Sequence, residues 1–233
     1  MTASTGCAGG NDAPGATDLF ASIRLAARAL QLDVSESQII QLAAYVELMV
    51  RWNKTYNLTA IRSIGDIVPQ HIADCLGCIG PLMRQLSRVT NPRILDVGSG
   101  GGLPGAVIAI TCPHIAVTCI DTVGKKAAFL TQVAAELKLA NLHSVNGRVE
   151  SAAVADASFD VVCCRAFSSL AKFVHLSRHA LRPGGKWLAM KGVLPTAEIA
   201  ELPDEVEVFH VEPLRIPGLN AERCLVWMAE AKK

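Results

Sequence analysis

One short stretch, residues 94–105, constrains the fold of this chain more than any other. It reads Ile-Leu-Asp-Val-Gly-Ser-Gly-Gly-Gly-Leu-Pro-Gly, and a helix-compatible run, Ala106 to Ile110, follows it. Glycine adopts positive φ and leaves free the space that a Cβ would occupy, so an apolar strand that ends in glycines can turn sharply. The first N–H groups of the following helix face that turn with a partial positive charge. The stretch therefore predicts a strand–turn–helix unit that can hold a nucleoside with a polar tail.

Two acidic residues narrow this prediction. The motif Gly98-x-Gly100-x-x-Leu103 lacks the third glycine of the dinucleotide fingerprint, and Asp96 stands in the strand where dinucleotide enzymes usually carry an apolar residue or glycine. Asp121 ends a second strand-like run, about 20 residues on, where an acid can bind ribose hydroxyls. The Asp-x-Gly-x-Gly form resembles motif I of S-adenosylmethionine methyltransferases. In that interpretation Asp96 orients the turn or the methionine end of the cofactor, and Asp121 binds the ribose; a turn without a ligand is the alternative.

Composition bounds the class of protein. The 233 residues suffice for one domain and an appendage, and apolar residues make up 51% of them. A net charge of +1 does not indicate a strongly basic nucleic-acid binder, although a local basic patch remains possible. No apolar run reaches the ~18 residues that a membrane helix needs, so we expect no membrane association. Residues 1–17 are rich in small residues and lack a signal peptide's basic start and apolar core, which predicts a disordered tail.

Eight cysteines are present, and Cys75-x-x-Cys78 is the one pair with metal-like or redox-like spacing. No second pair and no suitably spaced histidine pair accompanies it, so we expect no metal. Reduced thiols in a cytoplasmic protein are the simplest interpretation.

The amino-terminal part is predicted to be helical. Apolar periodicity predicts helices over residues 18–32, 35–51 and 64–79, the second opened by the capping box Ser35-x-x-Gln38. Pro81 is expected to end or bend the third helix, and Asn91-Pro92 marks a junction. We therefore divide the chain into a tail (1–17), a helical substrate-side region (18–90) and a second domain (91–233).

From residue 93 onward, strand-like and helix-like segments alternate. This order predicts right-handed crossovers and a mostly parallel, Rossmann-like α/β sheet of seven strands. The last two strands lack a long helix between them, so an antiparallel final strand is expected. The predicted strands are 93–97, 115–120, 142–146, 159–164, 186–190, 205–211 and 223–229, and the predicted helices are 104–111, 124–139, 169–181 and 195–201.

Ligands of such sheets sit beyond the carboxyl ends of the strands. Val149 and Glu150 follow the third strand, where they would face an adenine ring; a surface loop is the alternative. Arg165 ends a fully apolar strand, where a guanidinium needs an anion, supplied by a ligand or by a structural salt bridge. Lys191 follows the fifth strand with the same logic, but lysine is more easily solvated.

The helical part holds further candidates. His71 and Asp74 share one helix face and could form an acid–base pair, a metal pair or a structural contact. Trp52 and Tyr56 could stack on nucleic-acid bases or simply pack the helices.

Six motifs follow one another along the chain: Trp52-Asn53-Lys54-x-x-Asn57-Leu58-Thr59-Ala60-Ile61, His71-x-x-Asp74, Asp96 to Gly105, Asn146-Gly147-Arg148-Val149-Glu150, Arg165-Ala166 and Met190-Lys191-Gly192. In this joint order they resemble a known family, the bacterial 16S ribosomal RNA guanine-N7 methyltransferases, also called glucose-inhibited division protein B. The resemblance covers roughly residues 20–230. Cys75 and Cys164 stand where serine is common in the family, and both changes are nearly isosteric.

The resemblance implies a class I methyltransferase fold, S-adenosylmethionine as cofactor, and a guanine near the decoding centre as target. It also implies roles for individual residues. The cofactor-binding set is Asp96, Gly98, Gly100, Leu103, Asp121, Val149, Glu150 and Arg165; the substrate-binding set is Asn53, Lys54, Asn57, His71 and Lys191; and Arg165, Lys191 and His71 are placed at the reaction centre.

The chemistry fits these residues. Guanine N7 carries a lone pair and can attack a sulfonium methyl group without losing a proton, so no general base is needed. Alignment and exclusion of water are needed instead, and Arg165 is best interpreted as a positioning group. The target guanine would have to be unstacked to enter the site.

The low net charge bears on the substrate. Phosphate contacts drive RNA affinity, so a protein of charge +1 should bind naked RNA weakly unless its basic residues cluster. We therefore expect the substrate to be 16S rRNA within a folded small ribosomal subunit or its precursor. Separately, we expect the protein to be a monomer. The residues that would have to cluster are Arg51, Lys54, Arg62, Arg165, Lys172, Arg178 and Lys191.

Other functions stay open at this point. The chain could methylate another RNA, a protein or a small molecule, or it could be a non-catalytic RNA-binding assembly factor. A nicotinamide-dependent oxidoreductase is disfavoured by Asp96 and by the missing third glycine.

Overall fold

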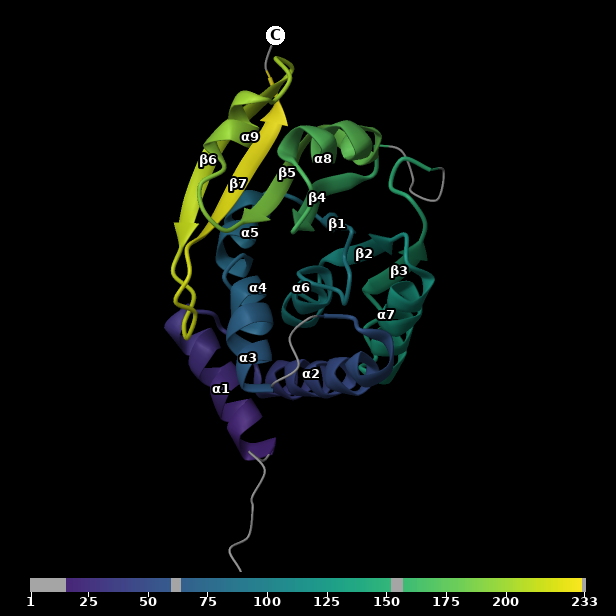
Figure 1. Ribbon diagram of the computed structural model, residues 1–233, viewed down its shortest axis with the longest axis vertical. Coiled ribbons are helices and arrows are strands. Elements are labelled where there is room, and N and C mark those ends of the chain that lie inside the picture. The colour runs from purple at the N-terminus through teal and green to yellow at the C-terminus, as the bar shows by residue number, and fades with distance from the viewer. Residues whose placement is uncertain (1–15, 60–63, 152–156, 232–233) are drawn as a thin grey trace, which may run out of the picture.

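A computed structural model describes residues 16–59, 64–151 and 157–231 of the protein, and its centre is a seven-stranded sheet in the order β3-β2-β1-β4-β5-β7-β6 (Figure 1). Strands β1 to β5 are parallel, and β7 lies antiparallel between β5 and β6. The predicted Rossmann-like sheet with an antiparallel last strand is confirmed. The strands are β1 (Arg93–Val97), β2 (Ala116–Asp121), β3 (Leu142–Asn146), β4 (Phe159–Arg165), β5 (Leu181–Lys191), β6 (Val206–Leu214) and β7 (Arg223–Glu230).

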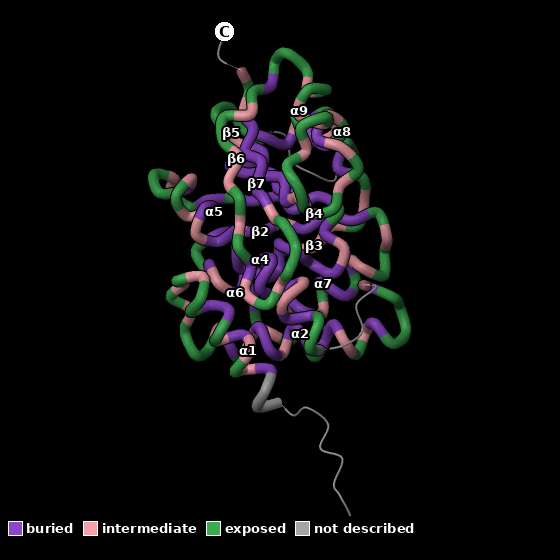
Figure 2. Tube along the Cα trace, turned by 60° about the vertical axis from the view of Figure 1, so that its left-hand side comes forward, coloured by how far each residue is buried: buried purple, intermediate pink, exposed green. Residues whose placement is uncertain are grey.

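Successive side chains of each central strand point to opposite faces of the sheet, and these side chains are mostly apolar on both faces. Both faces therefore have to be covered by helices, as is usual for parallel sheets. Ile94 joins the apolar cluster on one face and Leu95 the cluster on the other. The first face is covered by α6 (Gly105–Thr111) and α7 (Gly124–Glu136), and the second by α8 (Leu170–Ser177) with α9 (Thr196–Ala200). Figure 2 shows that burial is concentrated in the interior of the molecule, where the central strands lie, and that the outer faces of the helices are exposed.

The amino-terminal helices add a layer to the first face. α1 (Ala16–Ala29) packs on α2 (Glu36–Tyr56), which in turn packs on α6 and α7. The predicted capping box at the start of α2 is confirmed: Ser35 Oγ accepts from the Gln38 N–H, and Gln38 Oε1 accepts from the Ser35 N–H. Buried residues of this layer belong to the same apolar cluster as the sheet, so the helices and the sheet share one core. The predicted tail lies almost wholly outside the described residues.

The third predicted helix is more irregular than expected. It forms α3 (Ile64–Ile67), a π-helix (Val68–Ala73) and α4 (Asp74–Leu76), and a further helix that we did not predict, α5 (Ile79–Leu86), follows. Pro81 was expected to end or bend the segment, but it lies in the first turn of α5. That position tolerates proline because the first N–H groups of a helix have no partner within the helix.

The segment 182–185 is also corrected by the structure. It was predicted as a turn after a helix ending at residue 181, but α8 ends at Ser177 and a 3-10 turn spans Arg178–Ala180. Strand β5 already begins at Leu181, which pairs with Phe159, and the register then shifts so that Lys186 pairs with Val161. An Arg-Pro-Gly-Gly sequence is a strong turn signal, and here the irregularity in strand pairing accommodates it.

The connection between β6 and β7 folds back onto the irregular helical segment. Its Ile216 lies against Gly77, and Gly218 approaches Pro69. The start of β7 is thereby brought to the sheet edge where the parallel strands end. Within the described residues no helix is long and apolar enough to span a membrane.

Candidate functional site

A cavity of about 640 Å³ lies at the carboxyl edge of the sheet. Val97 and Gly98 line it at the end of β1, and residues 120–123 line it at the end of β2. Residues 147–150 and 165–168, which follow β3 and end β4, complete the wall with part of α8. This is where ligands of open α/β sheets bind, so the predicted location of the site agrees with the cavity.

The glycine-rich turn gives the cavity its shape. Gly98, Gly100 and Gly102 have φ of +67°, +58° and +91°, backbone conformations that residues other than glycine rarely adopt. A Cβ at Gly98 would lie 3.6 Å from the ring of Phe167, which also lines the cavity. The turn thus offers bare backbone to a ligand, as binding a nucleoside in close contact requires.

Asp121 ties the turn to the second strand. Its Oδ2 accepts from the Gly100 N–H at 2.9 Å, and its Oδ1 accepts from the Val123 N–H at 2.9 Å. Lys126 Nζ lies 3.4 Å from Oδ2. Asp121 also lines the cavity, so the residue predicted to bind ribose lies at the wall, and backbone donors fix the position of its side chain.

Asp96 lies beneath the turn and is fully buried. Its Oδ2 accepts from the Gly105 N–H at 2.8 Å, while Oδ1 has no hydrogen-bond partner among the described residues. Burial raises the pKa of this carboxyl to about 7. The side chain contacts the turn and does not line the cavity, which agrees with the first of its two predicted roles, orienting the turn; a role toward the methionine end of the cofactor stays a prediction.

Some of the remaining predicted cofactor residues line the cavity, and others lie behind its wall. Val149 is buried and forms an apolar part of the wall, and Glu150 is exposed at the rim, 3.6 Å from Arg148. Leu103 packs into the core and Gly100 supports the turn through its N–H, so neither lines the cavity.

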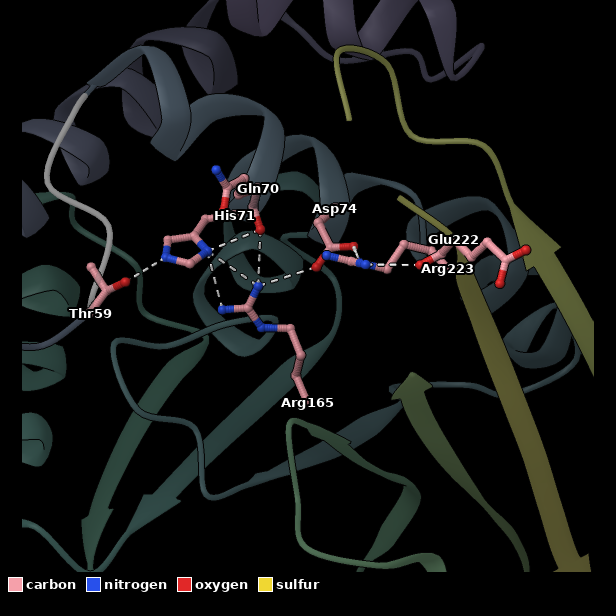
Figure 3. A network of polar contacts seen from close by, with 7 residues as sticks. All are labelled: Thr59, Gln70, His71, Asp74, Arg165, Glu222 and Arg223. Carbon is pink, nitrogen blue, oxygen red and sulfur yellow. Dashed lines mark hydrogen bonds and ion pairs between the residues drawn. The ribbon is translucent and has the colours of Figure 1, made fainter. Parts of the chain in front are cut away.

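Arg165 connects the cavity to the amino-terminal helices (Figure 3). Its NH1 lies 3.2 Å from Asp74 Oδ2 and donates to the Gln70 carbonyl at 3.3 Å. Asp74 also binds Arg223, whose Nε donates to Oδ1 at 2.9 Å. Reasoning from the sequence missed Arg223; its position at the start of a strand antiparallel to β5, and hence at the same sheet edge, was the signal that could have found it.

His71 belongs to the same network. Its Nε2 lies 2.7 Å from Thr59 Oγ1, and its Nδ1 lies 3.0 Å from the Gln70 carbonyl and 3.3 Å from Arg165 NH1. Burial, and then the nearby Arg165 charge, lower the pKa of His71 to about 4. The predicted pairing of His71 with Asp74 is indirect, because both side chains contact Arg165. No group of three potential metal ligands is found among the described residues.

Other predicted substrate residues lie apart from the cavity. Lys191 Nζ donates to Glu198 Oε2 at 2.7 Å, so its anion is a residue of α9. Asn53 is buried, and its Oδ1 accepts from the Thr59 N–H at 2.9 Å. Lys54 and Asn57 are exposed at the end of α2. Their roles in binding substrate stay predictions.

The aromatic and cysteine candidates differ in how far they are packed within the protein. Trp52 packs edge-on against Phe129 at 5.5 Å between ring centroids, and its Nε1 donates to Gln132. Tyr56 is exposed beside it. Cys75 and Cys78 are buried free thiols, and burial raises the pKa of both.

The chain is similar to one family over most of its length. The family model GidB, described as rRNA small subunit methyltransferase G, matches residues 38–226. Proteins named ribosomal RNA small subunit methyltransferase G are close relatives. That of Acidovorax ebreus (strain TPSY) is 52% identical over 219 residues, covering 91% of this chain and 96% of the relative. That of Methylibium petroleiphilum is 52% identical over 202 residues, covering 87% and 90%.

Solved structures support the fold. A putative S-adenosyl-L-methionine-dependent methyltransferase from Methanococcus maripaludis superposes with a TM-score of 0.54 at 14% identity, covering 81% of this chain and 93% of the other. An S-adenosylmethionine-dependent methyltransferase from Aquifex aeolicus has a TM-score of 0.52 at 14% identity, covering 64% and 88%.

The buried contact at Gly105 predicts that the turn tolerates no side chain there. In Gly105→Ala the new Cβ would overlap Cys119 Sγ and lie 2.8 Å from Asp96 Oδ2. We expect the free energy of unfolding to fall by about 1–3 kcal/mol in denaturant titrations. Gly124→Ala is the matched control, since its Cβ would have Asn146 Oδ1 as nearest neighbour at 3.5 Å. Equal stability of the two variants would contradict this account.

The raised pKa of Asp96 predicts a pH-dependent stability difference. The folded protein holds the Asp96 proton up to about pH 7, whereas the ordinary pKa is 3.8, so ionisation opposes folding as the pH rises between these values. Relative to Asp96→Asn, the wild type should therefore lose stability from about pH 4 to about pH 7. Unfolding titrations of both proteins at several pH values measure this difference, and a constant difference would refute it. The opposite contribution of His71 is common to both proteins and cancels.

Proposed function

We infer the reaction from one premise: the chain belongs to the GidB family, the rRNA small subunit methyltransferases G. It is an S-adenosylmethionine-dependent enzyme that methylates guanine in 16S ribosomal RNA. We propose further that the methylated atom is N7 of a guanine near the decoding centre. The observation that locates this reaction in the structure is the cavity at the carboxyl edge of the sheet, which Gly98 and Asp121 line.

The residues of the cavity fit the cofactor. Gly98 lines the cavity without a side chain, and Asp121 lines it as well, so we propose that the Asp121 carboxylate accepts from ribose hydroxyls in addition to its backbone donors. Val149 offers an apolar surface to an adenine ring, with Glu150 at the rim. When bound there, S-adenosylmethionine supplies an electrophilic methyl group on a sulfonium ion.

The reaction at N7 requires little acid–base chemistry from the protein. The N7 lone pair forms the new N–C bond while the C–S bond breaks, and no proton is transferred. His71, with its pKa near 4, is neutral at pH 7 and would be a weak base, which is compatible with a reaction that needs none. The protein instead aligns the reacting groups and excludes water, and Arg165 at the wall is proposed as the aligning cation.

The charge distribution supports a folded substrate. Three of the basic residues that were candidates for an RNA-binding cluster are engaged in ion pairs: Arg165 with Asp74, Arg178 with Glu230 and Lys191 with Glu198. Fewer free cations remain for naked RNA, so we propose 16S rRNA within the small subunit or its precursor as the substrate. Action as a monomer stays a prediction.

Mapping the methylated base tests the proposal. The purified protein should transfer labelled methyl groups from S-adenosylmethionine to small ribosomal subunits isolated from a strain lacking the enzyme. Strand scission after borohydride reduction should then place 7-methylguanine at one position near the decoding centre. Transfer to another atom of guanine, or to several positions, would overturn the proposed target.

The role of Asp121 is tested by cofactor affinity. Asp121→Ala removes the acceptor proposed for ribose and the partner of the Gly100 N–H, so we expect S-adenosylhomocysteine to bind more weakly by about 1.5–3 kcal/mol. Isothermal titration measures this loss, and Asp160→Asn, a buried acid paired with Arg182, is the control. Unchanged affinity in Asp121→Ala would remove the residue from the site.

A further inference from the structure

We propose that Asp74, itself held by Arg223, is a positioning residue that fixes the Arg165 guanidinium at the wall of the cavity. The inference rests on the proposed function of that cavity. It extends the site beyond the strand ends, to the helical layer and to the start of β7.

The contacts place Asp74 between the two guanidinium groups (Figure 3). Its Oδ2 is 3.2 Å from Arg165 NH1, and its Oδ1 accepts from Arg223 Nε at 2.9 Å. Arg223 is held in turn by its own NH1, which donates to the Glu222 carbonyl at 2.8 Å. Both oxygens of one carboxylate are therefore used, one for the residue at the cavity and one for a second cation behind it.

Burial makes this arrangement sensitive to the loss of the carboxylate. The Asp74 side chain is 4% exposed, against 21% for Arg165 and 26% for Arg223. His71 adds no charge at neutral pH, so one negative charge stands between two positive ones. Without Asp74 the two guanidinium groups would repel each other in a poorly solvated place, and Arg165 would have to move.

The topology explains why a residue outside the sheet is needed. β4, which carries Arg165, and β7, which carries Arg223, are separated in the sheet by β5. Asp74 comes from α4 and lies 91 residues from Arg165 and 149 from Arg223 in the sequence. One carboxylate thus spans two strands that do not pair, and packing of the helical layer sets where Arg165 points.

The arrangement also leaves Arg165 free to act. NH1 lies near Asp74 and the Gln70 carbonyl, and both NH1 and NH2 lie near His71 Nδ1, at 3.3 and 3.4 Å, so the guanidinium plane is fixed. Guanidinium carries five N–H donors, and those not used in the network remain for an oxygen acceptor of a molecule in the cavity. Arg165 lines the cavity and Asp74 does not, so Asp74 can affect the reaction only through Arg165.

A double-mutant cycle tests the proposal. The rate of methyl transfer to small subunits is measured in single-turnover reactions for wild type, Asp74→Asn, Arg165→Lys and the double variant, with saturating cofactor. We expect Asp74→Asn to slow transfer about 10- to 100-fold in the wild-type background, because misplacement by an ångström has effects of that size. In the Arg165→Lys background the same change should slow transfer less than about twofold, since the group that Asp74 positions is already altered.

Controls separate positioning from general stability. Asp160→Asn removes an equally buried aspartate that pairs with Arg182 and accepts from the Arg93 N–H, at the opposite edge of the sheet. It should lower the unfolding temperature and leave the transfer rate unchanged below that temperature. If Asp74→Asn does not fold, Arg223→Gln replaces it in the cycle; it should slow transfer less than fivefold and again show no added effect with Arg165→Lys.

The outcomes distinguish a failure of the positioning role of Asp74 from a failure of the proposed function. Effects of Asp74→Asn and Arg165→Lys that multiply, or an Asp74→Asn rate equal to wild type, would overturn the positioning role. A wild-type protein that transfers no methyl group to any small-subunit RNA would instead overturn the proposed function, whatever the variants do. An active wild type with a non-additive cycle supports both.

Discussion

The site depends on a glycine turn that is held in shape by two acidic side chains. Asp96 accepts from the Gly105 N–H below the turn, and Asp121 accepts from the Gly100 N–H beside it. Glycines carry no side chains with which to fix their own conformation, and their freedom in the unfolded chain makes ordering costly. Acceptors from two neighbouring strands supply the missing constraint. Because β1 and β2 pair in register, with Asp96 opposite Cys119, the sheet places both acids correctly.

A second network orders the opposite side of the cavity. There Arg165 ends β4 beside the irregular helical segment 64–86, and Asp74 joins it to Arg223. Neighbouring strands of the sheet shape the glycine turn, whereas the network of Arg165, Asp74 and Arg223 also depends on the helical layer that packs on the sheet. The acidic side chains of the first network belong to the sheet alone, whereas the second also uses the amino-terminal helical layer and the last hairpin.

Much of the fold could be predicted because its signals are local. The alternation of strands and helices, the glycine motif and the capping box at Ser35 each depend on residues close together in the chain. The errors arose where tertiary contacts override such signals. Pro81 lies inside a helix because the first turn needs no donor, and Arg182 to Gly185 belong to a strand because a shift in register absorbs them. The sequence also left open which groups Asp96 and Lys191 contact within the protein, and the structure pairs them with the Gly105 N–H and with Glu198; their roles toward ligands stay predictions.

The sequence by itself determined the order of the strands' polar ends, and with it the edge at which Gly98, Asp121, Val149 and Arg165 meet. The alternation of strands and helices can be read from the periodicity of apolar residues, and it predicts parallel strands whose carboxyl ends share one edge. That edge can therefore be identified without knowing how the side chains pack. Only the tertiary structure decided which partner each charged group takes. Asp74 and Arg223 lie 149 residues apart, and their contact depends on how the helical layer and the last hairpin pack together. Contacts between residues so far apart produce no motif of fixed spacing in the sequence, because the ends of several elements come together only after folding.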